Sequence, residues 1–165
     1  MPQVVILMGS KSDEEKISPC VDVLRHLKVS YVMTVCSAHR TPERTVELVR
    51  QYEADGARVF VCAAGMAAHL AGAVAARTLR PVIGIPVSGT ALCGMDALFS
   101  TVQMPPGYPV ATVALDKAGA RNAAWLAAQI LALSDPELEA RLMEERAAMS
   151  LDVTRSGEEI RQKYA

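Results

Sequence analysis

The sequence predicts a parallel α/β fold, in which helices cover both faces of one sheet. Short apolar runs rich in β-branched residues recur along the chain, and each run is too short for an ordinary helix. Between these runs lie longer segments with helical spacing and good helix formers. Strict alternation of strand and helix is typical of a parallel sheet, because each parallel connection needs a crossover.

The expected elements follow in chain order. Five strands are predicted at Val4–Met8, Tyr31–Val35, Val59–Cys62, Val82–Ile85 and Val110–Leu115. Helices are predicted at Glu14–Leu27, Pro42–Asp55, Ala67–Thr78, Met95–Gln103 and Ala118–Leu133. The fold is therefore expected to have three layers, with a doubly wound sheet of about five strands in the middle.

Two helix boundaries have clear local signals, and one proline falls inside a predicted helix. Thr41 is expected to cap the second helix, because Pro42 suits the first helical position, and Gly56 is expected to end that helix. Pro19 falls inside the first helix, where it removes a backbone donor. We expect either a kink there or a helix that restarts with Ser18 as its cap.

An extra helix is expected after the last crossover. The break at Ser134-Asp135-Pro136 is followed by helical spacing over about 137–149. This helix could pack on a neighbouring subunit, and the polar tail over 150–165 is expected to fray. The whole chain, 1–165, is expected to form a single domain.

The composition indicates which binding partners and which cellular compartment to expect. Lys and Arg number 17 against 18 Asp and Glu, giving a net charge of -1, so a nucleic-acid partner is not expected. Hydrophobic residues make up 51%, which favours an obligate oligomer. The four cysteines form no CxxC pair and are expected to be reduced thiols. Without a predicted leader or membrane span, we expect a soluble, cytoplasmic protein.

The first strand is followed by a turn that suits an anion. In a parallel sheet, ligands bind where the loops leave the carboxyl ends of the strands. The turn Gly9–Asp13 offers the hydroxyls of Ser10 and Ser12 and backbone N–H groups just before a helix. Asp13 could cap the helix or bind a ribose diol. An equally plausible reading is a capped turn with no ligand.

The second strand is followed by Ser37-Ala38-His39-Arg40, directly before a helix start. Arg40 can bind phosphate oxygens through its planar fork, and an imidazole such as that of His39 can move protons near neutral pH. A lone loop histidine is more often structural. The clustering of these residue types favours a functional site.

The third and fourth loops are built from small residues. Ala63–Gly72 contains Gly65, Ala67, His69 and Leu70, and it could approach a ligand closely or pack tightly against another helix. The fourth loop offers hydroxyls and glycine over 88–94. No zinc spacing, hydrolase elbow or dinucleotide fingerprint is present. The residues alone indicate a small phosphorylated metabolite and histidine proton transfer, and they form no metal-site pattern.

The order of the motifs resembles the PurE family. Six short motifs follow one another in the order found in that family, and the likeness runs from about Gln3 to about Met149. These motifs are GSKSD, SAHRTP, AAHL, VQMP, PVATVAL and KAGA. The resemblance implies a flavodoxin-like sheet and a homo-octamer. It also implies isomerisation of N5-carboxyaminoimidazole ribonucleotide to 4-carboxy-5-aminoimidazole ribonucleotide, without metal or cofactor. The chain departs from the family pattern at Met66 and Ala71, where a glycine and a proline are usual.

The resemblance also implies roles for individual residues. Ser10, Ser37 and Arg40 would bind the phosphate, Asp13 would bind the ribose hydroxyls, and His39 would be the general acid and base. The substrate site would be completed by six further residues: Ser12, Ala38, Gly65, Ala67, His69 and Leu70.

Two other functions stay open at this stage. One is the carboxylase branch of the same family, which uses free carbon dioxide and the uncarboxylated aminoimidazole ribonucleotide. The other is a non-catalytic module that binds a phosphorylated metabolite. The stretch 67–70, Ala-Ala-His-Leu, resembles the mutase branch and favours it over the carboxylase.

Overall fold

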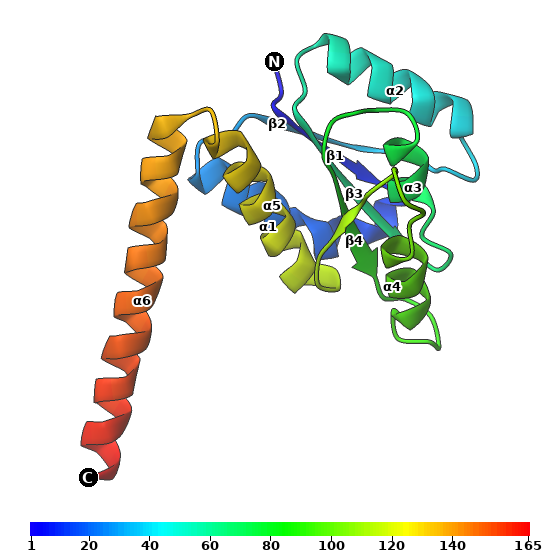
Figure 1. The fold of residues 1–165 in the computed structure, drawn as a ribbon. Coiled ribbons are helices and arrows are strands. Elements are labelled where there is room, and N and C mark those ends of the chain that lie inside the picture. The colour runs from blue at the N-terminus through cyan, green and yellow to red at the C-terminus, as the bar shows by residue number, and fades with distance from the viewer.

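A computed structural model describes all 165 residues and has one five-stranded, all-parallel sheet (Figure 1). The strands are β1 Val4–Met8, β2 Tyr31–Val35, β3 Val59–Gly65, β4 Val82–Val87 and β5 Ala111–Thr112. They lie in the order β2-β1-β3-β4-β5. This order is that of a flavodoxin-like doubly wound sheet, as predicted.

Helices cover both faces of the sheet (Figure 1). They are α1 Glu14–His26, α2 Pro42–Ala54, α3 Leu70–Ala75, α4 Met95–Val102, α5 Asp116–Ala132 and α6 Pro136–Tyr164, with a short 3-10 turn, η1, at Lys11–Asp13. One buried cluster joins alternate strand residues such as Ile6 and Val61 to α1, α5 and the start of α6. A second cluster joins the residues between them, such as Leu7 and Phe60, to α2 and α3. The predicted three-layer architecture is confirmed.

One of the two expectations for the first helix is wrong. Helix α1 runs without a break from Glu14 to His26 with Pro19 inside it, so it does not restart at Ser18, while a kink at Pro19 stays a prediction. Proline cannot donate to the carbonyl four residues earlier, which here belongs to Glu15. The Ser18 hydroxyl lies 3.4 Å from that carbonyl oxygen and offers it a weak replacement bond. Ile17, Cys20, Val21 and Leu24 are buried, and this packing keeps the helix continuous.

The second helix has the predicted start and ends one residue earlier than predicted, at Ala54. Helix α2 begins at Pro42, and Gly56, two residues past its end, has a φ of +92°. The left-handed conformation is one that glycine adopts without strain. Thr41 stands at the cap position, but its side chain makes no capping bond and bonds to Ser37 instead.

Strands β3 and β5 and helix α3 have boundaries that differ from the predicted ones. Strand β3 continues to Gly65, which pairs with Val87, and α3 begins only at Leu70 instead of the predicted Ala67. Met66 has a φ of +56°, which is incompatible with a right-handed helix at that point. Strand β5 has two residues instead of six, because it is an edge strand that pairs only with Ile83 and Gly84 of β4.

The predicted frayed tail is wrong. Helix α6 has 29 residues and reaches Tyr164, where the sequence predicted a helix ending near Met149. Pro136 opens the helix, and the Asp135 carboxylate caps it by accepting from the Leu138 N–H at 3.0 Å. Of its residues only Leu138 and Leu142 are buried. The rest of α6 projects beyond the body of the domain (Figure 1).

None of these helices combines the length and the apolarity needed to cross a membrane.

Candidate active site

A cavity of about 360 Å³ opens at the carboxyl edge of the sheet, where the loops after β1, β2, β3 and β4 meet. All of the predicted site residues except Ala67 line it: Ser10, Ser12, Asp13, Ser37, Ala38, His39, Arg40, Gly65, His69 and Leu70. Ala67 is exposed outside the lining, and its neighbours Met66 and Ala68 face the cavity instead. The residues predicted from three separate loops therefore lie around one cavity, and their roles there stay a prediction.

A larger hollow of about 1100 Å³ lies at the opposite edge, near the amino ends of β4 and β5. Arg50, Arg77 and Arg80 are the cations along it, and Glu53 already pairs with Arg80 at 3.9 Å. This hollow contains no histidine and none of the predicted site residues. Size alone is therefore a poor guide to the site in this molecule, and the chemistry gathers in the smaller cavity.

The first loop is ordered by its own serines. Ser10 caps η1, because its Oγ accepts from the Ser12 N–H at 3.2 Å and from the Ser12 hydroxyl at 2.8 Å. Asp13 stands at the cap position of α1 but makes no capping bond. The carboxylate of Asp13 is thus left to face the cavity, and the alternative that Asp13 caps α1 is wrong.

The Asp13 carboxyl is partly withdrawn from water. Burial raises the pKa of Asp13 above its ordinary value, and the hydrogen bond from Ser12 and the charge of Lys16 oppose that rise only in part. The Ser12 hydroxyl lies 3.4 Å from the Asp13 Oδ1 and can donate its one hydrogen there instead of to Ser10. A partly buried carboxylate with a free oxygen is a suitable acceptor for a pair of ribose hydroxyls.

The second loop is closed by Ser37 and Thr41. The Ser37 N–H donates to Thr41 Oγ1 at 3.0 Å, and the Thr41 hydroxyl donates back to the Ser37 carbonyl at 3.1 Å. The Arg40 N–H donates to Ser37 Oγ at 3.2 Å. These bonds fix the turn while the side chains of His39 and Arg40 stay exposed. The hydroxyl hydrogen of Ser37 remains available to a ligand.

His39 and His69 meet across the cavity. Nε2 of His39 lies 2.6 Å from Nδ1 of His69, and the rings are edge to face with centroids 4.7 Å apart. One of these two nitrogens must carry the hydrogen and the other the lone pair. The contact holds the His39 ring in one orientation and gives it a neighbour that can take or return a proton. The alternative that His69 is only a packed residue is thereby disfavoured.

The third loop comes close to the neighbouring strand at Gly65. A Cβ atom built on Gly65 would lie 2.9 Å from the carbonyl oxygen of Val87, so only glycine fits there without a shift. Met66 follows with a positive φ and an exposed side chain, 67% accessible, at the rim of the cavity. Leu70 and Ala71 are buried beneath the loop. The loop thus serves both as a ligand-facing wall and as packing for α3.

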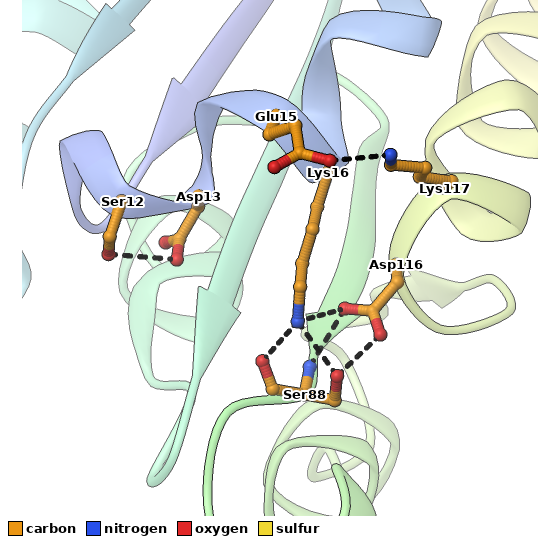
Figure 2. Close-up of polar contacts among 7 residues, drawn as sticks. All are labelled: Ser12, Asp13, Glu15, Lys16, Ser88, Asp116 and Lys117. Atoms are coloured by element: carbon orange, nitrogen blue, oxygen red, sulfur yellow. Dashed lines mark hydrogen bonds and ion pairs between the residues drawn. The ribbon is translucent and has the colours of Figure 1, made fainter.

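Sequence reasoning missed a polar cluster at the fourth wall. Lys16 of α1, Ser88 after β4 and Asp116 at the start of α5 bond to one another beside the cavity (Figure 2). Ser88 belongs to the predicted fourth loop, 88–94, whereas Lys16 and Asp116 stand in no predicted site loop. No local signal joins residues that stand 72 and 28 positions apart.

No group of three or more His, Cys, Asp or Glu side chains is arranged to hold a metal ion. The expectation of activity without metal or cofactor stays a prediction, since it concerns the reaction and not the geometry alone.

The sequence profile of the AIR carboxylase family matches residues 3–152. The chain belongs to the AIR carboxylase family. Within that family, the chain is 50% identical to the N5-carboxyaminoimidazole ribonucleotide mutase of Pyrococcus abyssi over 149 residues, covering 90% of this chain and 84% of that protein. It is 48% identical to the mutase of Escherichia coli K12, over 92% of this chain and 89% of that protein. It is 47% identical to the mutase of Bacillus subtilis, over 96% of this chain and 98% of that protein.

Solved structures agree with this AIR carboxylase family assignment. The crystal structure of Treponema denticola PurE superposes with a TM-score of 0.88 at 29% identity, covering 96% of this chain and 98% of that chain. The suspected family is therefore confirmed by both sequence and fold. The cavity described above is the candidate active site of this family member.

Proposed function

We propose that this protein is an N5-carboxyaminoimidazole ribonucleotide mutase, which forms 4-carboxy-5-aminoimidazole ribonucleotide in purine biosynthesis. The observation that supports this most is the cavity itself. It joins a bonded histidine pair to two loops that offer hydroxyls and a guanidinium. Relatives with 47% to 50% identity are named as this mutase. A cavity of about 360 Å³ is in the range that suits a small metabolite.

Substrate binding is assigned to the first two loops. Ser10, Ser37 and Arg40 would bind the 5′-phosphate, since hydroxyl donors and a guanidinium fork match its oxygens. Asp13 would accept from the ribose hydroxyls. Ser12 and Ala38 would support these contacts from the same loops. The imidazole ring would then lie against Gly65, His69 and Leu70.

The reaction needs two proton transfers that cancel. Protonated His39 gives its proton to the carbamate nitrogen as the bond from that nitrogen to the carboxyl carbon breaks, and the bonding electrons stay on nitrogen. Carbon dioxide is released into the cavity and is attacked by the electron-rich C4 of the imidazole ring, forming the new carbon–carbon bond. Neutral His39 then removes the C4 hydrogen as a proton, which restores the aromatic ring and the starting state of the histidine.

The histidine pair suits this cycle. The 2.6 Å contact with His69 orients the His39 ring and can stabilise either protonation state by exchanging donor and acceptor roles. Holding carbon dioxide beside its acceptor replaces capture from dilute solution with an intramolecular step.

The experiment that tests this function is His39→Asn. The amide keeps much of the shape but cannot cycle a proton, so kcat should fall by about 10²- to 10⁴-fold, while the dissociation constant for substrate changes less than about threefold. The matched control is His26→Asn, because His26 lies on α1 and contacts Glu145 of α6, away from the cavity. Turnover by His39→Asn within tenfold of the unaltered enzyme would refute the assignment.

We further propose that the protein acts in the cytoplasm as a homo-oligomer, an octamer as the resemblance implies. Its four cysteines are all unpaired, as expected in a reducing compartment. Exposed apolar side chains support self-association: Met95, Phe99 and Val102 form one face of α4, each about half accessible.

Helix α6 adds a longer apolar stripe. Three pairs of apolar residues repeat every 11 residues along α6, so they share one face of a nearly straight helix. The pairs are Leu138 and Leu142, Met149 and Val153, and Ile160 and Tyr164. The first pair packs on the domain and the other two pairs are exposed. A second copy of the chain is the partner that would cover them.

A further inference from the structure

Lys16, Ser88 and Asp116 come from three separate elements and form one compact bonded group (Figure 2). The Lys16 ammonium donates to the Ser88 carbonyl at 2.6 Å and to its Oγ at 2.8 Å, and it lies 3.2 Å from the Asp116 carboxylate. The Asp116 carboxylate accepts from the Ser88 N–H at 2.9 Å and from its hydroxyl at 2.5 Å. Both the backbone and the side chain of Ser88 are therefore held from two sides.

Asp116 occupies an unfavourable backbone conformation to make these bonds. Its φ is +52°, in the left-handed region, where a residue with a side chain is strained and glycine is not. Burial alone would raise the pKa of Asp116, but the hydrogen bonds from Ser88 and the ammonium of Lys16 outweigh it, and the pKa lies below its ordinary value. The carboxylate is thus bound in its charged form.

The group adjoins the substrate cavity through Ser88. Ser88 and Gly89 line the cavity, directly after the end of β4. Most of the loop that follows Ser88 is exposed to solvent, at Gly89, Ala91, Leu92 and Cys93. The next side-chain bond along this loop joins Thr90 to Asp96. Ser88 is therefore the point where the exposed loop is tied to α1 and α5.

We propose that Lys16 and Asp116 are positioning residues, which hold Ser88 and Gly89 in the substrate-binding arrangement before the ligand arrives. This inference rests on the proposed function, because it concerns the same cavity. Neither residue lines the cavity, so each acts through Ser88. When only a fraction of the protein has a competent site, the apparent affinity falls by that fraction. Loss of the group should therefore raise KM and leave kcat nearly unchanged.

The test compares Asp116→Gly and Lys16→Met with a matched control, Lys117→Met. Glycine suits the left-handed backbone, so Asp116→Gly removes the carboxylate without adding strain. Lys117 pairs with Glu15 at 2.7 Å and also joins α5 to α1, but it does not touch Ser88 (Figure 2). We expect KM to rise about three- to tenfold in the first two variants, with kcat within about twofold, and no change in the control.

Two more variants sharpen the test. The double variant Lys16→Met/Asp116→Gly should raise KM no further than the more affected single variant, because both residues act on one group. Asp116→Asn, which keeps an acceptor for the Ser88 N–H, should restore part of the affinity lost in Asp116→Gly. An unchanged KM, an equal rise in the control, or a fall in kcat alone would each overturn the proposal.

Amide hydrogen exchange of the segment 88–94 tests the positioning role of Lys16 and Asp116 independently of catalysis. Its amides should exchange faster in Asp116→Gly than in the unaltered protein or in Lys117→Met. If the unaltered protein has no mutase activity, the proposed function fails, and this measurement still tests the positioning role. Equal exchange in all three proteins would overturn it.

Discussion

Met66 combines a strained backbone with a prominent position at the cavity. Its φ of +56° lies in the left-handed region, and its side chain is exposed at the rim. The preceding Gly65 is held close to the Val87 carbonyl, which leaves the chain little freedom to relieve Met66. A side chain at such a position costs about 1 to 2 kcal/mol relative to a relaxed conformation. The strain is stored where the substrate would bind.

The strain at Met66 predicts an unusual response to glycine. Met66→Gly removes the left-handed penalty, whereas the neighbouring Ala67→Gly removes no such penalty and only adds freedom to the unfolded chain. Met66→Gly should therefore be about 1 to 2 kcal/mol more stable than Ala67→Gly, with a Tm higher by several degrees. Thermal unfolding at equal protein concentration is the measurement. Equal Tm values, or a lower one for Met66→Gly, would contradict the assigned strain.

At the scale of the elements, local patterns predicted what depends on local sequence. Strand β1 and the start of α2 follow directly from an apolar run and from Pro42, and both have the predicted starts. The end of α6 was missed because residues 150–165 are mostly polar, and their sparse apolar side chains repeat every 11 residues. A helix with so few apolar positions resembles a solvated tail in composition.

For the candidate site as well, clusters within one loop could be predicted from the sequence, and contacts between loops could not. The loops carrying Ser10 and His39, which line the cavity, could be predicted as site loops because unusual residues cluster within each of them. The contact of His39 with His69 and the bonds of Ser88 with Lys16 and Asp116 join distant parts of the chain. Such pairings depend on which strands are neighbours in the sheet, and no single loop contains that information.

The stripe on α6 gives a prediction at this scale. Val153 and Leu151 are almost equally exposed in one chain, 73% and 71%, but only Val153 lies on the stripe. Val153→Asp should therefore break the assembly into smaller species, and Leu151→Asp should not, since a buried unpaired charge is costly. Light scattering at micromolar concentration measures the mass. Identical masses for the two variants would exclude the stripe as an interface.

At the scale of the whole molecule, the cavity and the exposed apolar side chains of two helices lie on different elements. The loops after β1, β2, β3 and β4 meet in the cavity at the carboxyl edge of the sheet. The exposed apolar side chains of α4 and α6 are left uncovered in one chain. The reaction proposed for the cavity needs the released carbon dioxide to stay there until it bonds to C4. This retention distinguishes a mutase from a carboxylase.

The fate of the carboxyl carbon tests this central claim most directly. The enzyme is given N5-carboxyaminoimidazole ribonucleotide labelled with ¹³C in the carboxyl group, in buffer containing excess unlabelled bicarbonate, and the product is analysed by mass spectrometry. Retention of carbon dioxide in the cavity predicts that most of the product keeps the label, because recombination is intramolecular. Product carrying mainly unlabelled carboxylate would show that the carbon dioxide comes from solution, and it would contradict the mutase assignment.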